Sequence, residues 1–172
     1  MSYVARHSSK PTKVNWRQVK RIFRYLIGTI NYGIFYSKNC NAKCIGYPDS
    51  DWAGDTKDRK STSGYRFTMN GALISWKTSK QTCVALSTAE AEYVALASAA
   101  QEAVWLNKFL ADIHSSHKLP IVINEYNQAA ISIAKNPKEH SKTKHIAIKY
   151  HLVRDKIANN EIAFNIVLLS LC

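Results

Sequence analysis

Acidic side chains are scarce in this sequence, so the places where they occur in pairs are informative. Asp49 and Asp51 follow an apolar segment, and Glu90 and Glu92 lie near the start of another. Mg²⁺ prefers oxygen ligands, and two such ions can hold the attacking and leaving oxygens of a phosphodiester. If the two pairs converge in the fold, they indicate divalent-metal phosphoryl chemistry. The alternative is ordinary surface charge, which helix starts favour through their dipole.

The charge balance points to a polyanionic partner. Lys and Arg number 24 against 12 Asp and Glu, a formal net charge of +12. Basic domains attract polyanions, of which nucleic acid is the commonest inside a cell; a solvated basic surface is the alternative. Charged residues interrupt every apolar segment before it reaches membrane-spanning length, and residues 1–11 contain no apolar signal-peptide stretch. We therefore expect an intracellular protein without a membrane partner.

Two other kinds of site do not match the sequence. Cys40 and Cys44 lack the second close pair of Cys or His residues that a zinc site needs. A serine hydrolase would carry a Gly-x-Ser-x-Gly turn, and the sequence has none. Metal-dependent phosphoryl chemistry therefore stays the main hypothesis.

The first half of the chain is predicted to form one helix and three strands. Residues 15–27 place Trp16 and Phe23 on one face and arginines on the opposite face, which is typical of a basic amphipathic helix. Residues 44–51, 64–69 and 72–76 have the pattern of short strands. The Asn-Gly pair at 70–71 predicts that the last two form a hairpin.

Helices and strands alternate in the second half. Residues 87–114 are rich in alanine and begin with Ser87-x-x-Glu90, the spacing of a capping box, with a candidate break at residues 101–102. Strands are predicted at 120–125 and 162–169, and helices at 127–135 and 144–158. A hairpin run followed by this alternation predicts an α/β fold with a mixed sheet and helices packed on its faces.

Several motifs, in order and at matching spacing, closely resemble the RNase H domain of copia-type retrotransposon Pol polyproteins. They extend from about residue 44 to residue 167, and the segment 16–36 resembles the stretch that joins reverse transcriptase to this domain. The motifs are Gly46-Tyr47-Pro48-Asp49-Ser50-Asp51-Trp52-Ala53-Gly54-Asp55, Arg59-Lys60-Ser61-Thr62-Ser63-Gly64-Tyr65, Ile74-Ser75-Trp76, Ala85-Leu86-Ser87-Thr88-Ala89-Glu90-Ala91-Glu92-Tyr93, Glu102-Ala103-Val104-Trp105-Leu106, Asn127-Gln128 and His140-Ser141-Lys142-Thr143-Lys144-His145-Ile146.

The resemblance implies a fold, a domain organisation and an activity. The fold is an RNase H-like mixed five-stranded sheet, with the first three strands antiparallel, the last two parallel, and helices on both faces. Residues 1–40 would be a remnant of the reverse transcriptase connection segment, and residues 41–172 an RNase H-like domain truncated at its C-terminus. The family's enzyme cuts the RNA strand of RNA/DNA hybrids with four carboxylates and two Mg²⁺ or Mn²⁺ ions. It acts beside the reverse transcriptase portion, in the cytoplasm, a virus-like particle or the nucleus.

Carried over residue by residue, the family's first carboxylate falls on Asp49 and the second on Glu92. Glu90 already serves the predicted capping box, so it stays an alternative for the second position, as Asp51 does for the first. The third carboxylate should directly precede Asn127-Gln128, where this chain has Tyr126. Its neighbour Glu125 would face the other way, because successive strand residues point to opposite faces.

These departures predict a weakened metal site. The fourth carboxylate would lie beyond the last strand, past residue 172. Two divalent ions about 4 Å apart repel by roughly 16 kcal/mol at an effective dielectric of 20, and Asp49 and Glu92 supply only two negative charges. We therefore expect one weakly bound ion and cleavage that is weak or absent. Two alternatives remain: a non-catalytic nucleic-acid-binding remnant, and a host-adopted interaction module.

Cationic, aromatic and amide residues near the motifs are candidates for contact with an RNA/DNA hybrid. Most are equally well explained as solvated surface side chains, and Trp76 as core. The candidates are Arg59, Lys60, Trp76, Lys77, Asn127, Gln128, Lys142, Lys144 and His145.

Overall fold

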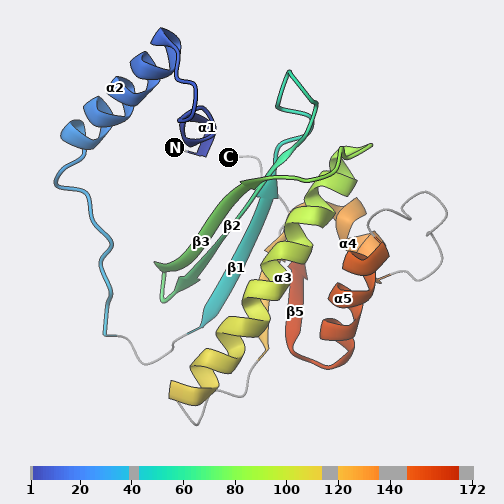
Figure 1. The fold of residues 1–172 in the computed structure, drawn as a ribbon. Helices are drawn as coiled ribbons and strands as arrows, with labels where there is room; N and C mark the ends of the chain where they lie inside the picture. The colour runs from blue at the N-terminus through green and yellow to red at the C-terminus, as the bar shows by residue number, and fades with distance from the viewer. Residues whose placement is uncertain (1, 39–42, 114–119, 136–146, 167–172) are drawn as a thin grey trace. The chain divides into compact units, whose positions relative to one another are not determined.

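The computed structural model describes residues 2–38, 43–113, 120–135 and 147–166. The chain divides into two compact units, Met1–Tyr36 and Ser37–Cys172. The first unit contains α1 (Ser2–Ala5) and α2 (Lys13–Gly28) (Figure 1). In a reciprocal cap at the start of α2, the Thr12 N–H donates to Asn15 Oδ1 at 2.9 Å and the Asn15 N–H to Thr12 Oγ1 at 3.3 Å. The predicted helix at 15–27 is thus confirmed, with two further residues at its start and one at its end.

A mixed sheet of five strands forms the centre of the second unit (Figure 1). Its order is β3-β2-β1-β4-β5. Antiparallel pairing joins β1 to β2 and β2 to β3, and parallel pairing joins β1 to β4 and β4 to β5. This confirms the expected sheet. The strands are β1 (Cys44–Ser50), β2 (Thr62–Met69), β3 (Ala72–Lys80), β4 (Ile121–Glu125) and β5 (Ile162–Ile166).

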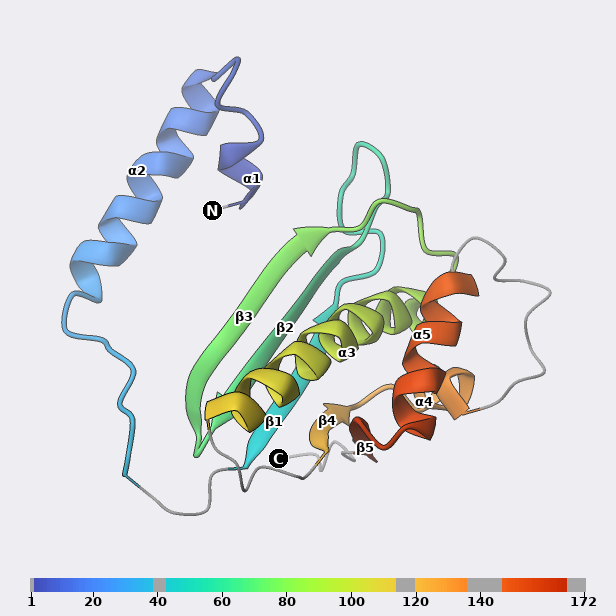
Figure 2. The same ribbon diagram turned by 60° about the horizontal axis from the view of Figure 1, so that its bottom comes forward.

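The long helix α3 (Thr88–Ile113) runs without interruption across β1 and β2 (Figure 2). The expected break near residues 101–102 is wrong. Glu102 points toward the sheet, where its carboxylate accepts hydrogen bonds from the hydroxyls of Tyr65 at 3.0 Å and Ser75 at 2.6 Å. A polar residue that looked like a helix breaker is therefore an anchor of the helix to β2 and β3.

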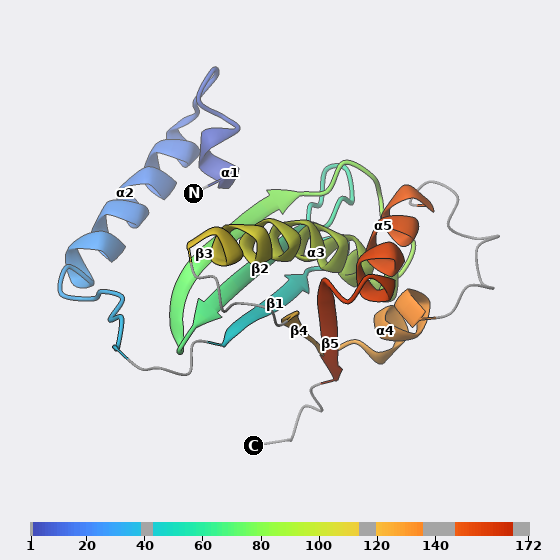
Figure 3. The same cartoon turned by 90° about the horizontal axis from the view of Figure 1, so that it is seen from below.

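Helices α3, α4 (Gln128–Lys135) and α5 (Ala147–Ala158) contact one another and lie on the same face of the sheet (Figure 3). The expectation of helices on both faces is corrected for the described part of this unit. The opposite face of β1, β2 and β3 carries no helix from the described segments of residues 37–172. None of the helices in the described residues combines the length and apolar character needed to cross a membrane.

Close packing sets the distance between α3 and the sheet. Alanines of α3, including Ala95 and Ala99, are fully buried against it, and Phe67 of β2 lies beneath them with 0% exposure. Gly46 of β1 makes room for that ring, because a Cβ at Gly46 would lie 2.5 Å from Phe67 Cε1. The N-terminus of α3 is thereby held beside the carboxyl end of β1.

Candidate active site

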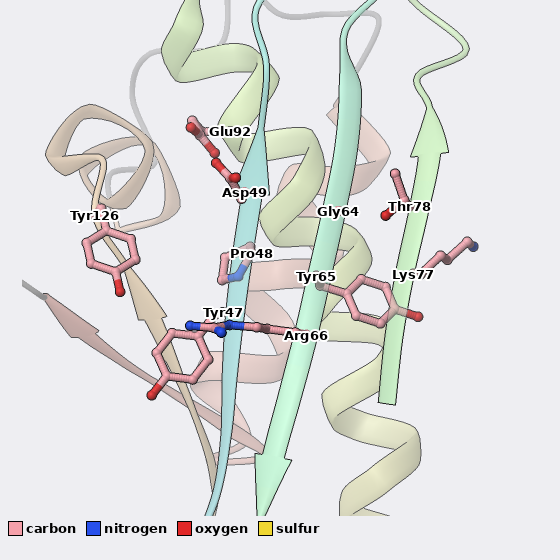
Figure 4. Close-up of a pocket in the computed structure, with 10 residues that line it drawn as sticks. All are labelled: Tyr47, Pro48, Asp49, Gly64, Tyr65, Arg66, Lys77, Thr78, Glu92 and Tyr126. Carbon is pink, nitrogen blue, oxygen red and sulfur yellow. The ribbon is translucent and has the colours of Figure 1, made fainter. Parts of the chain in front are cut away.

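A cavity of about 590 Å³ opens where β1 and β4 end (Figure 4). Its walls come from β1, β2, β3, the second turn of α3 and the residue that follows β4. The lining residues are Tyr47, Pro48, Asp49, Gly64, Tyr65, Arg66, Lys77, Thr78, Glu92 and Tyr126. In parallel sheets the carboxyl ends of neighbouring strands form the usual binding crevice. Here the β1–β4 ladder pairs Ile45 and Gly46 with β4 residues, so Pro48 and Asp49 lie beyond the paired part.

Asp49 and Glu92 come together in this cavity from different elements (Figure 4). Asp49 is the exposed penultimate residue of β1, and Glu92 is half-buried on α3. Glu90 is buried and holds the start of the helix, since its Oε2 accepts the Leu86 N–H at 2.7 Å and its own N–H donates to Ser87 Oγ at 3.2 Å. Glu90 does not line the cavity, whereas Glu92, two residues further along, does.

Asp51 has a structural role in the loop between β1 and β2. Its Oδ1 accepts the backbone N–H of Thr62, and its own N–H donates to the Thr62 carbonyl at 3.1 Å. Gly54 packs so tightly against this carboxylate that a side chain there would collide with it. Asp51 therefore closes the loop and lies outside the cavity lining.

Tyr126 lines the cavity at the position expected for the third carboxylate, and its side chain is 39% exposed. The preceding Glu125 faces the interior and is 1% exposed, as strand alternation predicts. Glu125 Oε1 accepts the Asn127 N–H at 2.9 Å, while its Oε2 is buried without a hydrogen-bond partner in the described part of the chain.

The carboxylates of Glu92, Glu125 and Asp49 nevertheless interact. Burial first, and then the charges of Glu125 and Asp49, raise the pKa of Glu92 to about 7, against a smaller opposing effect from hydrogen bonds with Ser50. The pKa of Glu125 is raised chiefly by burial and also by Asp49, while the N–H groups of Asn127 and Tyr126 oppose the rise. Glu125 was set aside in the sequence because it points to the other face. Proximity across the end of the sheet, which no sequence periodicity reports, is what makes it relevant.

The donor set fits one divalent cation better than two. Asp49 and Glu92 offer carboxylate oxygens in one cavity. The pKa of Glu92 is raised first by burial and then by the negative charges of Glu125 and Asp49, and a bound cation would oppose both effects. Within the described segments, however, no three His, Cys, Asp or Glu side chains are grouped closely enough to hold a metal ion. The described residues alone would not supply the ligands that a pair of divalent ions needs to offset their mutual repulsion.

The predicted nucleic-acid contacts divide into those near the cavity and those away from it. Lys77 lines the cavity, and its neighbour Trp76 is 64% exposed on β3, the edge strand. The prediction that Trp76 is core is therefore wrong. Arg59 and Lys60 lie in the β1–β2 loop outside the cavity lining, and Arg59 has a φ of 55° that the loop imposes.

The remaining predicted contacts lie at the start of α4 or outside the described residues. Asn127 caps α4, because its Oδ1 accepts the N–H groups of Ala129 at 2.9 Å and Ala130 at 3.1 Å. Gln128 is the exposed first residue of that helix. Lys142, Lys144 and His145 lie outside the described residues.

Sequence comparison finds long relatives among transposon polyproteins. The retrovirus-related Pol polyprotein from transposon TNT 1-94 of Nicotiana tabacum is 41% identical over 154 residues, 90% of this chain and 11% of the polyprotein. The retrovirus-related Pol polyprotein from transposon RE2 of Arabidopsis thaliana is 38% identical over 154 residues, again 90% of this chain and 11% of the polyprotein. The chain thus spans about a tenth of the length of these relatives. Secreted RxLR effector protein 161 of Plasmopara viticola is 48% identical over 103 residues, 60% of this chain and 72% of that protein. No protein-family model matches the chain.

Solved structures identify the fold. The N-terminal RNase H domain of Rv2228c from Mycobacterium tuberculosis superposes with a TM-score of 0.53 at 10% identity, covering 76% of this chain and 85% of that one. LC11-RNase H1, isolated from compost and solved in complex with an RNA/DNA hybrid, gives a TM-score of 0.53 at 14% identity, covering 74% and 86%. At these identities the likeness establishes an RNase H-like fold.

Proposed function

Because the chain belongs to the family of retrovirus-related Pol polyproteins from transposons, we propose that its RNase H-like domain hydrolyses the RNA strand of RNA/DNA hybrids, weakly. The observation that carries the proposal is the meeting of Asp49 and Glu92 in one cavity at the carboxyl ends of β1 and β4. Two carboxylates from separate elements, in a cavity also lined by Arg66 and Lys77, suit a phosphodiester substrate and a divalent cation.

Asp49 and Glu92 would hold one divalent cation, Mg²⁺ or Mn²⁺, which when bound offsets phosphate charge and makes water more acidic. Glu92 must be ionised to serve as a ligand, and its pKa of about 7 means that a proton competes with the cation near neutral pH. Tyr126 adds no negative charge at the third position. This shortage of ligands is the physical reason for weak cleavage.

The wider context follows from the family as part of the same proposal. Residues 1–40 belong to the reverse transcriptase connection segment, and residues 41–172 to the RNase H-like domain. Its partners are an RNA/DNA hybrid and the reverse transcriptase portion of a polyprotein, inside the cell. Tyr126 supports a second candidate, a domain that binds nucleic acid without cutting it, because an uncharged residue stands at the expected third carboxylate while Arg66 and Lys77 still line the cavity.

The test is cleavage of an RNA/DNA hybrid by the full chain in Mg²⁺ and in Mn²⁺. We expect slow cutting that Asp49→Asn and Glu92→Gln both abolish, while Asp112→Asn, an exposed carboxylate on α3, changes nothing. Tyr126→Asp should increase the rate. Cutting that survives Asp49→Asn contradicts the proposed site, and rapid Asp49-dependent cutting contradicts its weakness. No cutting, together with retained hybrid binding, supports the second candidate.

A further inference from the structure

Three side chains form a cross-strand row on the sheet face opposite α3. Antiparallel register pairs Tyr47 of β1 with Arg66 of β2, and Arg66 with Trp76 of β3. Residues directly opposite each other in paired strands project from the same face. In the described part of this unit no helix covers that face, and Arg66 and Trp76 are exposed. We name these three residues the Tyr47–Arg66–Trp76 row.

Arg66 is held in position while its charge stays available. Its guanidinium carbon lies 4.7 Å from the centre of the Tyr47 ring, a cation–π contact that orders the side chain (Figure 4). No carboxylate pairs with Arg66 among the described residues. A guanidinium stacked on an aromatic ring keeps its N–H donors directed outward, in a planar fork that matches phosphate geometry.

The row adjoins the acidic end of the cavity. Tyr47 and Arg66 line the same cavity as Asp49 and Glu92. Along β1, Asp49 lies two residues beyond Tyr47, a separation of about 6.6 Å in a strand, comparable to that of successive phosphates in a nucleic-acid strand. Gly64 of β2 is the register partner of Asp49 and lines the cavity without adding a side chain to it.

We propose that the Tyr47–Arg66–Trp76 row binds the backbone of the nucleic-acid strand next to the phosphate that lies at Asp49 and Glu92. Arg66 contacts the adjoining phosphate, and Trp76 packs against a sugar or base further along. The inference rests on the proposed function and deepens it. A chain with +12 net charge, with a guanidinium over one aromatic ring and an exposed indole on the neighbouring strand, complements a polyanion with stacked rings better than an apolar protein segment.

The experiment measures binding of a fluorescent RNA/DNA hybrid to the full chain by anisotropy in EDTA, which prevents metal-dependent cleavage, over a range of salt. Arg66→Gln should weaken binding and reduce the slope of log K against log salt by about 0.9, the value for one phosphate contact. Trp76→Ala should weaken binding at least roughly fivefold with the slope unchanged. Arg66→Lys should keep the slope, because it keeps the charge.

Matched controls lie on α3, on the opposite face of the sheet. Lys108→Gln removes an exposed cation and Trp105→Ala an exposed indole, and both should leave affinity and slope unchanged. Melting curves establish that each variant is folded, which their exposed positions favour. If Arg66→Gln fails to fold, Arg66→Lys still tests the contact. A smaller slope of log K against log salt in Arg66→Lys than in the unmodified chain would contradict a charge contact at this position.

The outcomes separate this inference from the proposed function. Equal effects of Arg66→Gln and Lys108→Gln would overturn the row, because the binding would then follow overall charge. Asp49-dependent cleavage with no effect of Arg66→Gln on binding would overturn the row and leave the nuclease standing. Arg66-dependent binding without cleavage would support the row and overturn the catalytic proposal. Absence of hybrid binding by the unmodified chain would overturn both.

Discussion

Replacing Glu92 by glutamine tests the electrostatics of the cavity directly. The substitution keeps the size of the side chain and removes its charge. Burial, followed by the charges of Glu125 and Asp49, raises the pKa of Glu92 from 4.5 to about 7. The ionised carboxylate is therefore an unfavourable feature of the folded chain in the absence of a cation, and its removal should stabilise the fold at alkaline pH.

The sign and size of the effect follow from proton linkage. Between about pH 4.5 and pH 7 the folded state holds a proton on Glu92 that the unfolded state has lost, so stability falls as pH rises through that window. The full shift corresponds to about 3 kcal/mol. Because the carboxyl is only half-buried, solvent screening reduces this to about 1–2 kcal/mol. We expect Glu92→Gln to be more stable by that amount at about pH 8 and no more stable at about pH 4.

The assay is urea unfolding in EDTA at several pH values, with Asp112→Asn as the matched loss of an exposed carboxylate. A second series adds Mn²⁺. A cation present at a concentration ten times its dissociation constant stabilises the folded state by about 1.4 kcal/mol. This gain in the free energy of unfolding should appear in the unmodified chain at about pH 8 and should be smaller in Glu92→Gln. Parallel pH curves for the unmodified chain and Glu92→Gln would refute the coupling of Glu92 to its acidic neighbours.

Two further predictions concern stability, and a third concerns the pKa of Tyr65. Gly46→Ala brings a Cβ to 2.5 Å from the Phe67 ring and should lower the free energy of unfolding by about 1–3 kcal/mol, as urea titration would show. Glu102→Ala removes the acceptor of the Tyr65 hydroxyl; burial and then Glu102 hold the pKa of Tyr65 at about 12, so ultraviolet titration should give a lower value in the variant. Asn127→Ala removes the cap of α4 and should cost about 1 kcal/mol in thermal unfolding, whereas Gln128→Ala, one residue later, should cost little.

Local signals in the sequence were sufficient for most elements. The Ser87 cap of α3 and the hairpin turn at residues 70–71 each depend on hydrogen bonds or dihedral angles within a few residues. The turn residues have φ values of 51° and 81°, as a two-residue Asn-Gly hairpin turn requires. Asp49 and Glu92 were chosen through the resemblance to the retrotransposon RNase H domain, and the structure brings both into one cavity.

Tertiary packing decided how those elements act on one another. The charge of Glu125 raises the pKa of Glu92 because β4 ends near α3 in the fold. Strand alternation alone placed Glu125 on the other face of β4, so the sequence offered no reason to connect it with the site. Glu102 looked like a helix break because its hydroxyl partners on β2 and β3 are remote in the sequence. The Tyr47–Arg66–Trp76 row likewise needs the register of three strands. Periodicity reports which side of its own element a residue faces, whereas charge coupling and cross-strand contact depend on distances between elements, which only the folded chain sets.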